Sequence, residues 1–567
     1  MPKSAPKFTE EQNSSDEPSE LEQTDTALTP PDDVAPPKPR KKGRAKTAAS
    51  KSKPIEVALW ETAENLRGSV EPAEYKHVVL PLFFLKYAGD RFDSQRAKIA
   101  AEHDNPAYLE IVSFYTAENV FYLPQESRWS FILANLKQSG LSLKIDTAFN
   151  HIEQSNSQLK GALPDNYYAR LNLDERKLSN LISEIDRIPT ATDQDTIGRI
   201  YEYFLQKFAV SEGSGKGEYY TPKSIVRLMA ELIQPYSGVI YDPCCGSGGM
   251  FVSSVKFIES HHGNRALPTI YGQEHTATTR KLARMNLAIR GITANLGADA
   301  ADTFHRDQHP DLRADFIMAN PPFNQKRWRG ENELIQDPRW AGYNVPPSGN
   351  ANYGWILHIA SKLKPNGTAA FLLANGALGG EDTEELAIRR RLIENDLVEA
   401  IFILPRELFY STDISVTLWL LSRNKQARAF DRNGRNIRHR NRTGEILFAD
   451  LRTWGVEFEK KYTTLTDDEI TRAARLFHEW QQTGIATIPE LCHSASATEI
   501  AAKNFSLVPS KYIPFQNRDT DLDYATEMKS LRDDFSEILA EETAAQTLLK
   551  DAFAGLGYKL HQTGGAR

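Results

Sequence analysis

Apolar residues recur at helical spacing in the first part of the chain. From Ile55 they return every three or four positions, which is typical of amphipathic helices, and this pattern continues through Phe92 and again from Leu178 to Ile188. We predict an all-α domain over residues 54–180. It holds no group of titratable residues that suggests catalysis, so we expect it to serve an interaction or to clamp DNA.

Beyond residue 181, short apolar runs alternate with amphipathic stretches. The runs that predict strands are Gly238–Asp242, Thr269–Gly272, Asp315–Ala319, Thr368–Leu373, Val398–Ile403 and Ser415–Ser422, and the predicted helices include Lys223–Ile233, Thr276–Arg290, Tyr353–Lys362 and Glu384–Asn395. Such alternation indicates a mainly parallel sheet covered by helices on both faces. We therefore predict an α/β fold with a doubly wound sheet over residues 181–430, and ligands at the carboxyl ends of its strands.

Residues 1–53 form a polar segment that is acidic up to Asp33 and basic from Lys38 to Lys46. Pro, Ser, Thr, Glu and Lys dominate it, so it has little apolar surface to bury, and we predict a disordered tail. Its basic half could contact DNA phosphates, although a run of charge is more often simply solvated.

The C-terminal quarter continues beyond the predicted sheet. Residues 431–515 predict a mixed polar extension with a short strand at Glu445–Phe448 and a helix near Asp467–Gln482. Residues 516–567 predict a helical docking segment, because Leu522–Phe553 carries apolar residues at nearly heptad spacing. The alternative is that this helix folds back onto the core of its own chain.

One strand runs directly into four residues with unusual chemistry, Asn320, Pro321, Pro322 and Phe323. The prolines lack a backbone donor and restrict φ, so the strand stops at Asn320. The Asn320 amide and the Pro321 carbonyl then offer two oxygen acceptors beside the Phe323 ring. An exocyclic amino group on an aromatic base is the complement, with two N–H donors and a π-face. The alternative is an ordinary Pro-Pro turn and a core phenylalanine.

A glycine-rich loop and three acidic positions predict a nucleoside cofactor. The loop, Gly246, Ser247, Gly248 and Gly249, follows a strand that ends at Asp242, and Phe251 replaces the third glycine of a dinucleotide fingerprint. Asp242 suits an amino group, Glu274 suits two ribose hydroxyls, and either Asp302 or Asp299 suits the adenine amino group. Each acid alone could cap a helix, but together they favour S-adenosylmethionine over NAD. Thr221 at the N-cap and Pro222 in the first turn of the following helix suit a carboxylate.

Overall composition limits the possible partners. The 567 residues carry a net charge of −7, so DNA contact should be local or supplied by a partner. Cys244, Cys245 and Cys492 provide neither a disulfide framework nor the ligand spacing of zinc, and we predict no metal site. We find no signal peptide and no apolar run long enough for a bilayer, so we expect a cytoplasmic protein without a membrane partner.

The long segment 325–352 predicts no helix or strand, yet it follows the strand that carries Asn320. It contains Lys326, Arg327, Trp328, Arg329, Trp340 and Tyr343. This mixture of basic and aromatic residues suits a lid over a flipped DNA base, and a surface insertion is the alternative.

The sequence resembles the modification (methylation) subunit of type I restriction-modification systems, which are amino-group DNA methyltransferases. The likeness rests, in order, on Ile197–Leu205, Gly217–Pro222, Asp242–Gly249, Met318–Asn324 and Asn352–Trp355. It implies a methyltransferase (Rossmann-like) sheet, S-adenosylmethionine as cofactor, and N6 of adenine in double-stranded DNA as target. It also implies a separate specificity subunit, shared by two methylation subunits, and a restriction or translocase subunit.

The resemblance also implies roles for individual residues. It implies that the cofactor is bound by Glu218, Tyr219, Tyr220, Thr221, Pro222 and the glycine loop. It implies that the target adenine is held by Asn320, Pro321, Pro322 and Phe323. Two rival functions remain at this stage. One is methylation of RNA or of a protein glutamine amide on the same fold, and the other is a non-catalytic binding subunit.

Overall fold

The structure is a computed structural model that describes residues 60–61, 74–171, 173–188, 201–207, 221–380, 382–409, 415–458, 462–484, 487–516 and 523–555. The predicted tail, 1–53, and three predicted cofactor residues, Glu218, Tyr219 and Tyr220, lie outside the described residues. Within the described residues, no helix combines the length and the apolar composition that crossing a bilayer requires.

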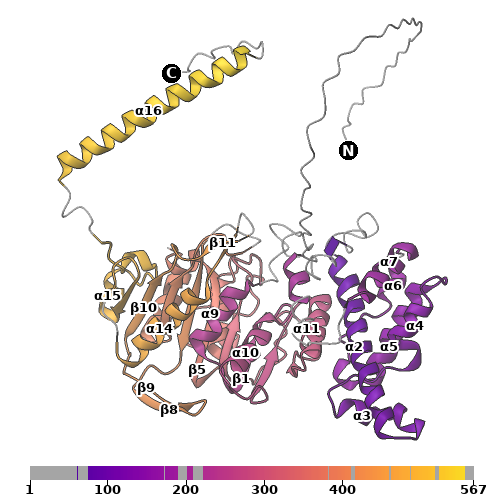
Figure 1. Ribbon diagram of the computed structural model, residues 1–567. Helices are drawn as coiled ribbons and strands as arrows, with labels where there is room; N and C mark the ends of the chain where they lie inside the picture. The colour runs from indigo at the N-terminus through magenta and orange to yellow at the C-terminus, as the bar shows by residue number, and fades with distance from the viewer. Residues whose placement is uncertain are drawn as a thin grey trace, which may run out of the picture. The chain divides into compact units, whose positions relative to one another are not determined.

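Helices alone make up the described part of the N-terminal region, as predicted. They are α2 (Tyr75–Glu102), α3 (Val112–Thr116), α4 (Trp129–Ala134), α5 (Leu141–Ser155), α6 (Tyr167–Arg170) and α7 (Glu175–Asp186), drawn in indigo and violet in Figure 1. Asp174 caps α7 by accepting a hydrogen bond from the Arg176 N–H at 2.8 Å. The apolar faces pack into one core, which also takes in Leu282 and Met285 from a helix of the following domain.

Nine described strands form one sheet in the order β13-β10-β6-β7-β5-β4-β1-β2-β3. They are β1 (Gly238–Asp242), β2 (Pro268–Gly272), β3 (Ala294–Asn295), β4 (Ala314–Ala319), β5 (Leu363–Ala374), β6 (Val398–Ile403), β7 (Val416–Ser422), β10 (Glu445–Asp450) and β13 (Cys492–Ser496). Pairing is parallel except where β7 joins β5 and β6 and where β13 joins β10. This confirms the predicted mainly parallel α/β sheet.

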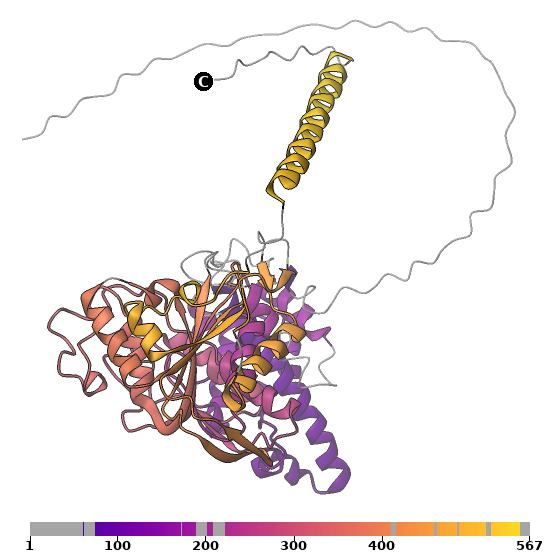
Figure 2. The same ribbon diagram turned by 90° about the vertical axis from the view of Figure 1, so that its left-hand side faces the viewer.

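Helices cover both faces of the sheet (Figures 1 and 2). They include α9 (Lys223–Ile233), α10 (Gly249–Ser260), α11 (Ala277–Ile289), α12 (Asn352–Lys362), α13 (Thr383–Glu394) and α14 (Asp467–Gln482). Side chains alternate along β5, so that Phe371 and Leu373 pack in the core of α12 and α13, whereas Ala370 and Leu372 pack in the core of α9 and α14. A near-continuous apolar strand is what burial on both faces requires.

Two strands of this sheet, β10 and β13, come from residues that the sequence analysis assigned to a separate polar extension. Their pairing with β6 depends on partners far away in the chain, so local polarity concealed it. The same region adds the hairpins β8–β9 (Arg428–Arg432 and Arg435–His439) and β11–β12 (Val456–Phe458 and Tyr462–Thr464), and the short helix α15 (Ala497–Ala502).

The chain's long C-terminal helix is α16 (Tyr524–Gly555), drawn in yellow in Figure 1. None of its 32 residues is buried. Its exposed apolar side chains include Met528, Leu531, Phe535, Ile538 and Leu549. The predicted helix is therefore confirmed, and its role in docking stays a prediction.

Candidate active site

The sheet reverses its strand order at β1, which pairs with β2 on one side and with β4 on the other. Ligands of doubly wound sheets bind beyond the carboxyl ends of strands at such a point. A cavity of about 240 Å³ lies here. Among the residues predicted from the sequence, those that line it are Thr221, Asp242, Gly246, Glu274, Asp302, Asn320 and Pro322.

The other predicted residues that the structure describes do not line this cavity. Ser247 and Gly249 line a neighbouring cavity of about 300 Å³ beside α9 and α10, and Thr221 borders both spaces. Pro222, Gly248, Pro321 and Phe323 are described but line neither cavity. Phe323 is half-buried and lies edge-to-face against Phe409, with ring centroids 5.7 Å apart.

Asn320 stands at the end of β4 with its two amide atoms in different situations. Its Nδ2 donates to Thr221 Oγ1 at 3.0 Å. Its Oδ1 is buried and has no hydrogen-bond partner among the described residues. An unpaired buried acceptor costs stability, so this oxygen is suited to a ligand that donates.

Thr221 does not cap the helix that follows it, and the prediction that it does is wrong. Helix α9 begins at Lys223 with Pro222 at the N-cap position, and no side chain caps it. The Thr221 hydroxyl instead accepts from the Asn320 amide, whose place at the end of β4 only the tertiary fold brings near.

Asp242 and Glu274 place two buried carboxyl groups at the ends of β1 and β2, with 1% and 4% of their surfaces exposed. Burial raises the pKa of Asp242 to about 7, and the charge of Glu274 adds to the effect, while a hydrogen bond from the Cys244 N–H at 3.0 Å opposes it. Burial also raises the pKa of Glu274. No described cation forms a salt bridge with either group.

Glycines shape the loop that brings backbone donors to Glu274. Gly246 and Gly248 have φ of 53° and 80°, a region that side chains disfavour. The Gly246 N–H donates to Glu274 Oε2 at 3.0 Å, and the Thr276 N–H donates to Oε1 at 2.8 Å. Each carboxylate oxygen keeps a lone pair that can accept a further hydrogen bond.

Of the two aspartates that the sequence could not separate, Asp302 lines the cavity. Its Oδ1 accepts from the backbone N–H groups of Phe304 and His305, both at 2.9 Å, which orients the carboxylate. The Asp299 side chain is 67% exposed, forms an ion pair with Arg306, and does not line the cavity.

Sequence reasoning missed several residues of the cavity wall, among them Gln325 and Trp355. Trp355 closes the motif that begins at Asn352, and Gln325 directly follows the motif that ends at Asn324. The two motifs meet in space, because Asn324 N–H donates to Asn352 Oδ1 at 3.1 Å and Asn352 Nδ2 donates to Asn324 Oδ1 at 2.9 Å. Their joint presence in the sequence was the available signal.

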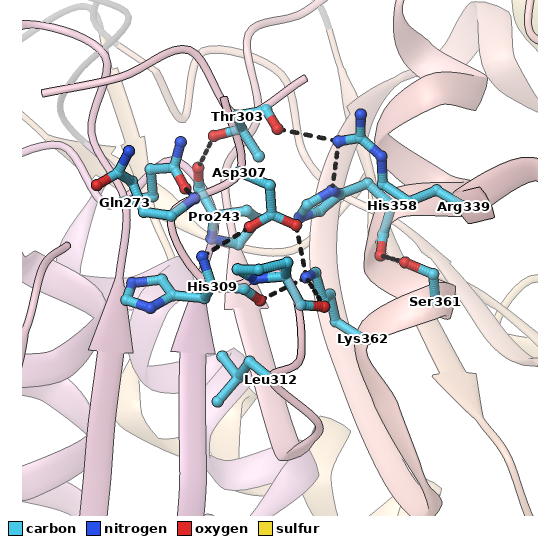
Figure 3. Close-up of polar contacts among 12 residues, drawn as sticks. Pro243, Gln273, Thr303, Asp307, His309, Leu312, Arg339, His358, Ser361 and Lys362 are labelled. Atoms are coloured by element: carbon cyan, nitrogen blue, oxygen red, sulfur yellow. Dashed lines mark hydrogen bonds and ion pairs between the residues drawn. The ribbon is translucent and has the colours of Figure 1, made fainter. Parts of the chain in front are cut away.

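A polar network begins at the cavity residues Pro243 and Thr303 (Figure 3). Thr303 Oγ1 donates to the Pro243 carbonyl at 2.6 Å, and Arg339 Nη1 donates to the Thr303 carbonyl at 2.9 Å. Arg339 also donates to His358 Nδ1 at 3.2 Å, so that nitrogen must be unprotonated. Burial lowers the pKa of His358 well below its ordinary value, which keeps the ring neutral. The network joins segment 325–352 to the residues around Asp302.

Segment 325–352 is anchored by its aromatic residues. Trp328 and Trp340 are 3% and 2% exposed and belong to the core that includes α12. These two rings are therefore not available to stack on a flipped base, whereas Lys326 and Arg327 are exposed. A lid role for this segment stays a prediction that rests on its basic side chains. No group of three or more His, Cys, Asp or Glu in the described part of the chain could hold a metal ion.

Known protein families and proteins match most of the described chain. A family model described as N-6 DNA Methylase matches residues 192–521, and one described as HsdM N-terminal domain matches residues 55–185. The HindI type I restriction enzyme methylase subunit of Haemophilus influenzae is 41% identical over 434 residues, which cover 75% of this chain and 94% of that protein. The MjaIX methylase subunit of Methanocaldococcus jannaschii is 33% identical over 528 residues, covering 89% and 92%.

A solved structure shares the fold. The type I restriction-modification methyltransferase subunit of Streptococcus thermophilus aligns with a TM-score of 0.67 at 21% identity, covering 81% of this chain and 99% of that one. The family match spans the sheet, the cavity and the Asn320 motif. The chain therefore belongs to the N-6 DNA methylase family, among the methylation subunits of type I restriction-modification systems, and its reaction is methylation of adenine N6 in DNA.

Proposed function

We propose that the cavity binds S-adenosylmethionine and that Asn320 and Pro321 hold the adenine amino group during transfer. The observation that carries this proposal is the buried Asn320 Oδ1, which lacks a partner among the described residues. Thr221 engages the other end of the amide, so the oxygen is presented to a donor.

The cavity's chemistry fits this cofactor. Asp242, Glu274 and Asp302 are three hydrogen-bond acceptors around one space. S-adenosylmethionine carries matching donors, namely an ammonium group, two ribose hydroxyls and the 6-amino group of adenine. A dinucleotide would bring a pyrophosphate close to buried carboxylates instead, at a high electrostatic cost. We assign the ammonium group to Asp242, the ribose to Glu274 and the adenine amino group to Asp302.

Residues of this chain must activate a weak nucleophile. The lone pair of adenine N6 is delocalised into the ring, and two acceptors on the amino group favour a tetrahedral nitrogen and offset its developing positive charge. Asn320 Oδ1 and the Pro321 carbonyl are those acceptors in our proposal. S-adenosylmethionine, when bound, supplies an electrophilic methyl group. A strongly basic side chain is not required, because the alkylated nitrogen becomes acidic.

The target base must leave the DNA helix to reach Asn320. Phe323 follows the two prolines and borders neither cavity, so we assign it to the target base rather than to the cofactor. Pro322 lines the cofactor cavity and stiffens the turn between the two ligands.

We further propose that α16 docks on a separate specificity subunit that chooses the DNA sequence, with two methylation subunits sharing one such partner. Apolar side chains that stay exposed along a 32-residue helix indicate a missing protein surface. A restriction or translocase subunit completes the assembly in this proposal.

Replacing Asn320 with Ala tests the catalytic assignment. With specificity subunit and duplex DNA present, methyl incorporation should fall by roughly 100-fold or more, because an acceptor aimed at developing charge is lost. Binding of S-adenosylhomocysteine should persist and serves as the folding control. Undiminished transfer would exclude the assignment. Digestion of the product to nucleosides distinguishes adenine in DNA from RNA or protein targets.

The docking assignment is tested on α16 itself. A Leu531→Asp, Phe535→Asp double variant should no longer co-purify with the specificity subunit, while the matched polar change Ser536→Asp should leave the complex intact. Cofactor binding should be equal in all three proteins. A stable complex formed by the double variant would rule out docking through this face.

A further inference from the structure

Three residues that line the same cavity each carry a buried polar atom without a hydrogen-bond partner among the described residues. The atoms are Asn320 Oδ1, Gln325 Oε1 and Trp355 Nε1. Asn320 and Gln325 offer acceptors, whereas the indole of Trp355 can only donate. Buried polar groups are normally paired, so unpaired atoms on three residues of one cavity wall indicate groups that bound ligands would pair.

Backbone hydrogen bonds hold Gln325 close to Trp355. The Ala351 N–H donates to the Gln325 carbonyl at 3.0 Å, and the Ala351 carbonyl accepts from the Trp355 N–H at 2.9 Å. Ala351 thus bridges the two residues. Both residues line the cavity, and Gln325 carries an unpaired acceptor while Trp355 carries an unpaired donor.

This part of the wall belongs to the Asp302 end of the cavity. The Trp355 ring is 4.4 Å from the Phe304 ring, measured between centroids, and the Phe304 N–H donates to Asp302 Oδ1. Trp355 is only 4% exposed, and Phe304 also packs against Trp328, so the indole has little freedom to turn away. Asn320 is tied instead to Thr221.

An adjacent acceptor and donor are the complement of adenine. The 6-amino group of adenine belongs to two edges of the base. On each of these edges, this donor lies next to a ring nitrogen that accepts a hydrogen bond. Hypoxanthine and guanine carry a carbonyl at position 6, which would face the Gln325 oxygen with a second acceptor.

We infer that Gln325 and Trp355 read the adenine of the cofactor. Gln325 Oε1 accepts from the 6-amino group, and Trp355 Nε1–H donates to the ring nitrogen on the same edge. The inference rests on the proposed binding of S-adenosylmethionine and adds to it the residues that select the base. Both are specificity determinants of binding, separate from the acceptors that act on the target amino group.

Binding of S-adenosylhomocysteine to the full chain, measured by calorimetry, tests this inference without any turnover. Probes are S-adenosylhomocysteine, its inosine counterpart with a 6-oxo group, and its 1-deaza and 7-deaza counterparts, each lacking one ring acceptor. The wild-type protein should prefer the parent compound over the inosine probe and over one deaza probe by about tenfold or more.

Trp355→Phe and Gln325→Leu remove one hydrogen-bonding atom each. Trp355→Phe should weaken S-adenosylhomocysteine binding about tenfold and abolish discrimination against that deaza probe, while Gln325→Leu should reduce discrimination against the inosine probe. Trp328→Phe is the matched control, because Trp328 packs on the same Phe304 ring but its Nε1 already donates to the Pro347 carbonyl at 2.9 Å. This control should retain every preference of the wild type.

The outcomes distinguish a failure of this inference from a failure of the proposed cofactor binding. If the wild-type protein binds S-adenosylhomocysteine and both variants keep its affinity and its base preferences, the inference is overturned alone. It is also overturned if the variants lose only binding of duplex DNA, since the two side chains would then face the target base. A wild-type protein that binds none of the probes overturns the proposed cofactor together with the inference.

Discussion

Cofactor binding should release a proton from Asp242. Burial raises the pKa of this carboxyl group from its ordinary value of 3.8 to about 7. The difference corresponds to about 4 kcal/mol of lost stabilisation of the charged form. In the free protein Asp242 is therefore about half protonated at neutral pH, and an ammonium group placed beside it should restore the charge and lower the pKa.

The direction of the pH effect follows from the raised pKa. The free protein binds this proton more tightly than the unfolded chain, so the group's contribution to stability is full below about pH 4 and is lost as pH rises to about 7. Binding of the cationic ligand behaves in the opposite way. It should be about tenfold weaker at pH 6 than at pH 8, because about nine in ten free molecules must first lose the proton at pH 6.

Calorimetry of S-adenosylhomocysteine binding measures both quantities. At pH 7, titrations in buffers with different ionisation enthalpies should report release of about half a proton. Asp242→Asn should remove this release and flatten the affinity between pH 6 and pH 8. Glu274→Gln should move the transition to lower pH, because the charge of Glu274 contributes to the raised pKa of Asp242. Binding by the wild type without proton release, at constant affinity over this range, would refute the reasoning.

Three further predictions concern other parts of the molecule. Arg442→Ala should lower the free energy of unfolding by about 3–5 kcal/mol, measured by urea denaturation, because it leaves Glu399 buried without its cation. Thr221→Val should lower the single-turnover methylation rate about tenfold, because Asn320 loses the hydroxyl that orients its amide, and Thr221→Ser should restore the rate. Arg339→Lys should speed amide hydrogen exchange in residues 325–352, because lysine cannot span the carbonyls and the imidazole that the guanidinium bridges.

Each of these predictions has an opposing result. An unchanged free energy of unfolding for Arg442→Ala would mean that water takes the place of the guanidinium beside Glu399. Equal single-turnover methylation rates for Thr221→Val and the wild type would mean that the Thr221 hydroxyl does not position Asn320. Exchange in Arg339→Lys that rises equally throughout the chain would indicate global destabilisation rather than release of the loop.

Local sequence was sufficient for most helices and strands up to residue 422 and for the motif at the end of β4. Periodicity of 2 or 3.6 residues acts over a few positions, so the strands, the covering helices and the class of sheet could be predicted. Proline chemistry is equally local, and it stops the strand at Asn320 wherever that strand lies. The long apolar seam of α16 was likewise visible without any knowledge of its surroundings.

Tertiary structure alone decided the details of the cavity. Thr221 and Asn320 are 99 positions apart, and their hydrogen bond replaced the predicted helix cap. Which of Asp299 and Asp302 lines the cavity, and how far burial raises the pKa of Asp242, depend on packing that no spacing reveals. Gln325 and Trp355 line one cavity only because the segment after β4 meets α12. Burial and pairing are properties of residues distant in the chain, so sequence patterns that act locally could not determine them.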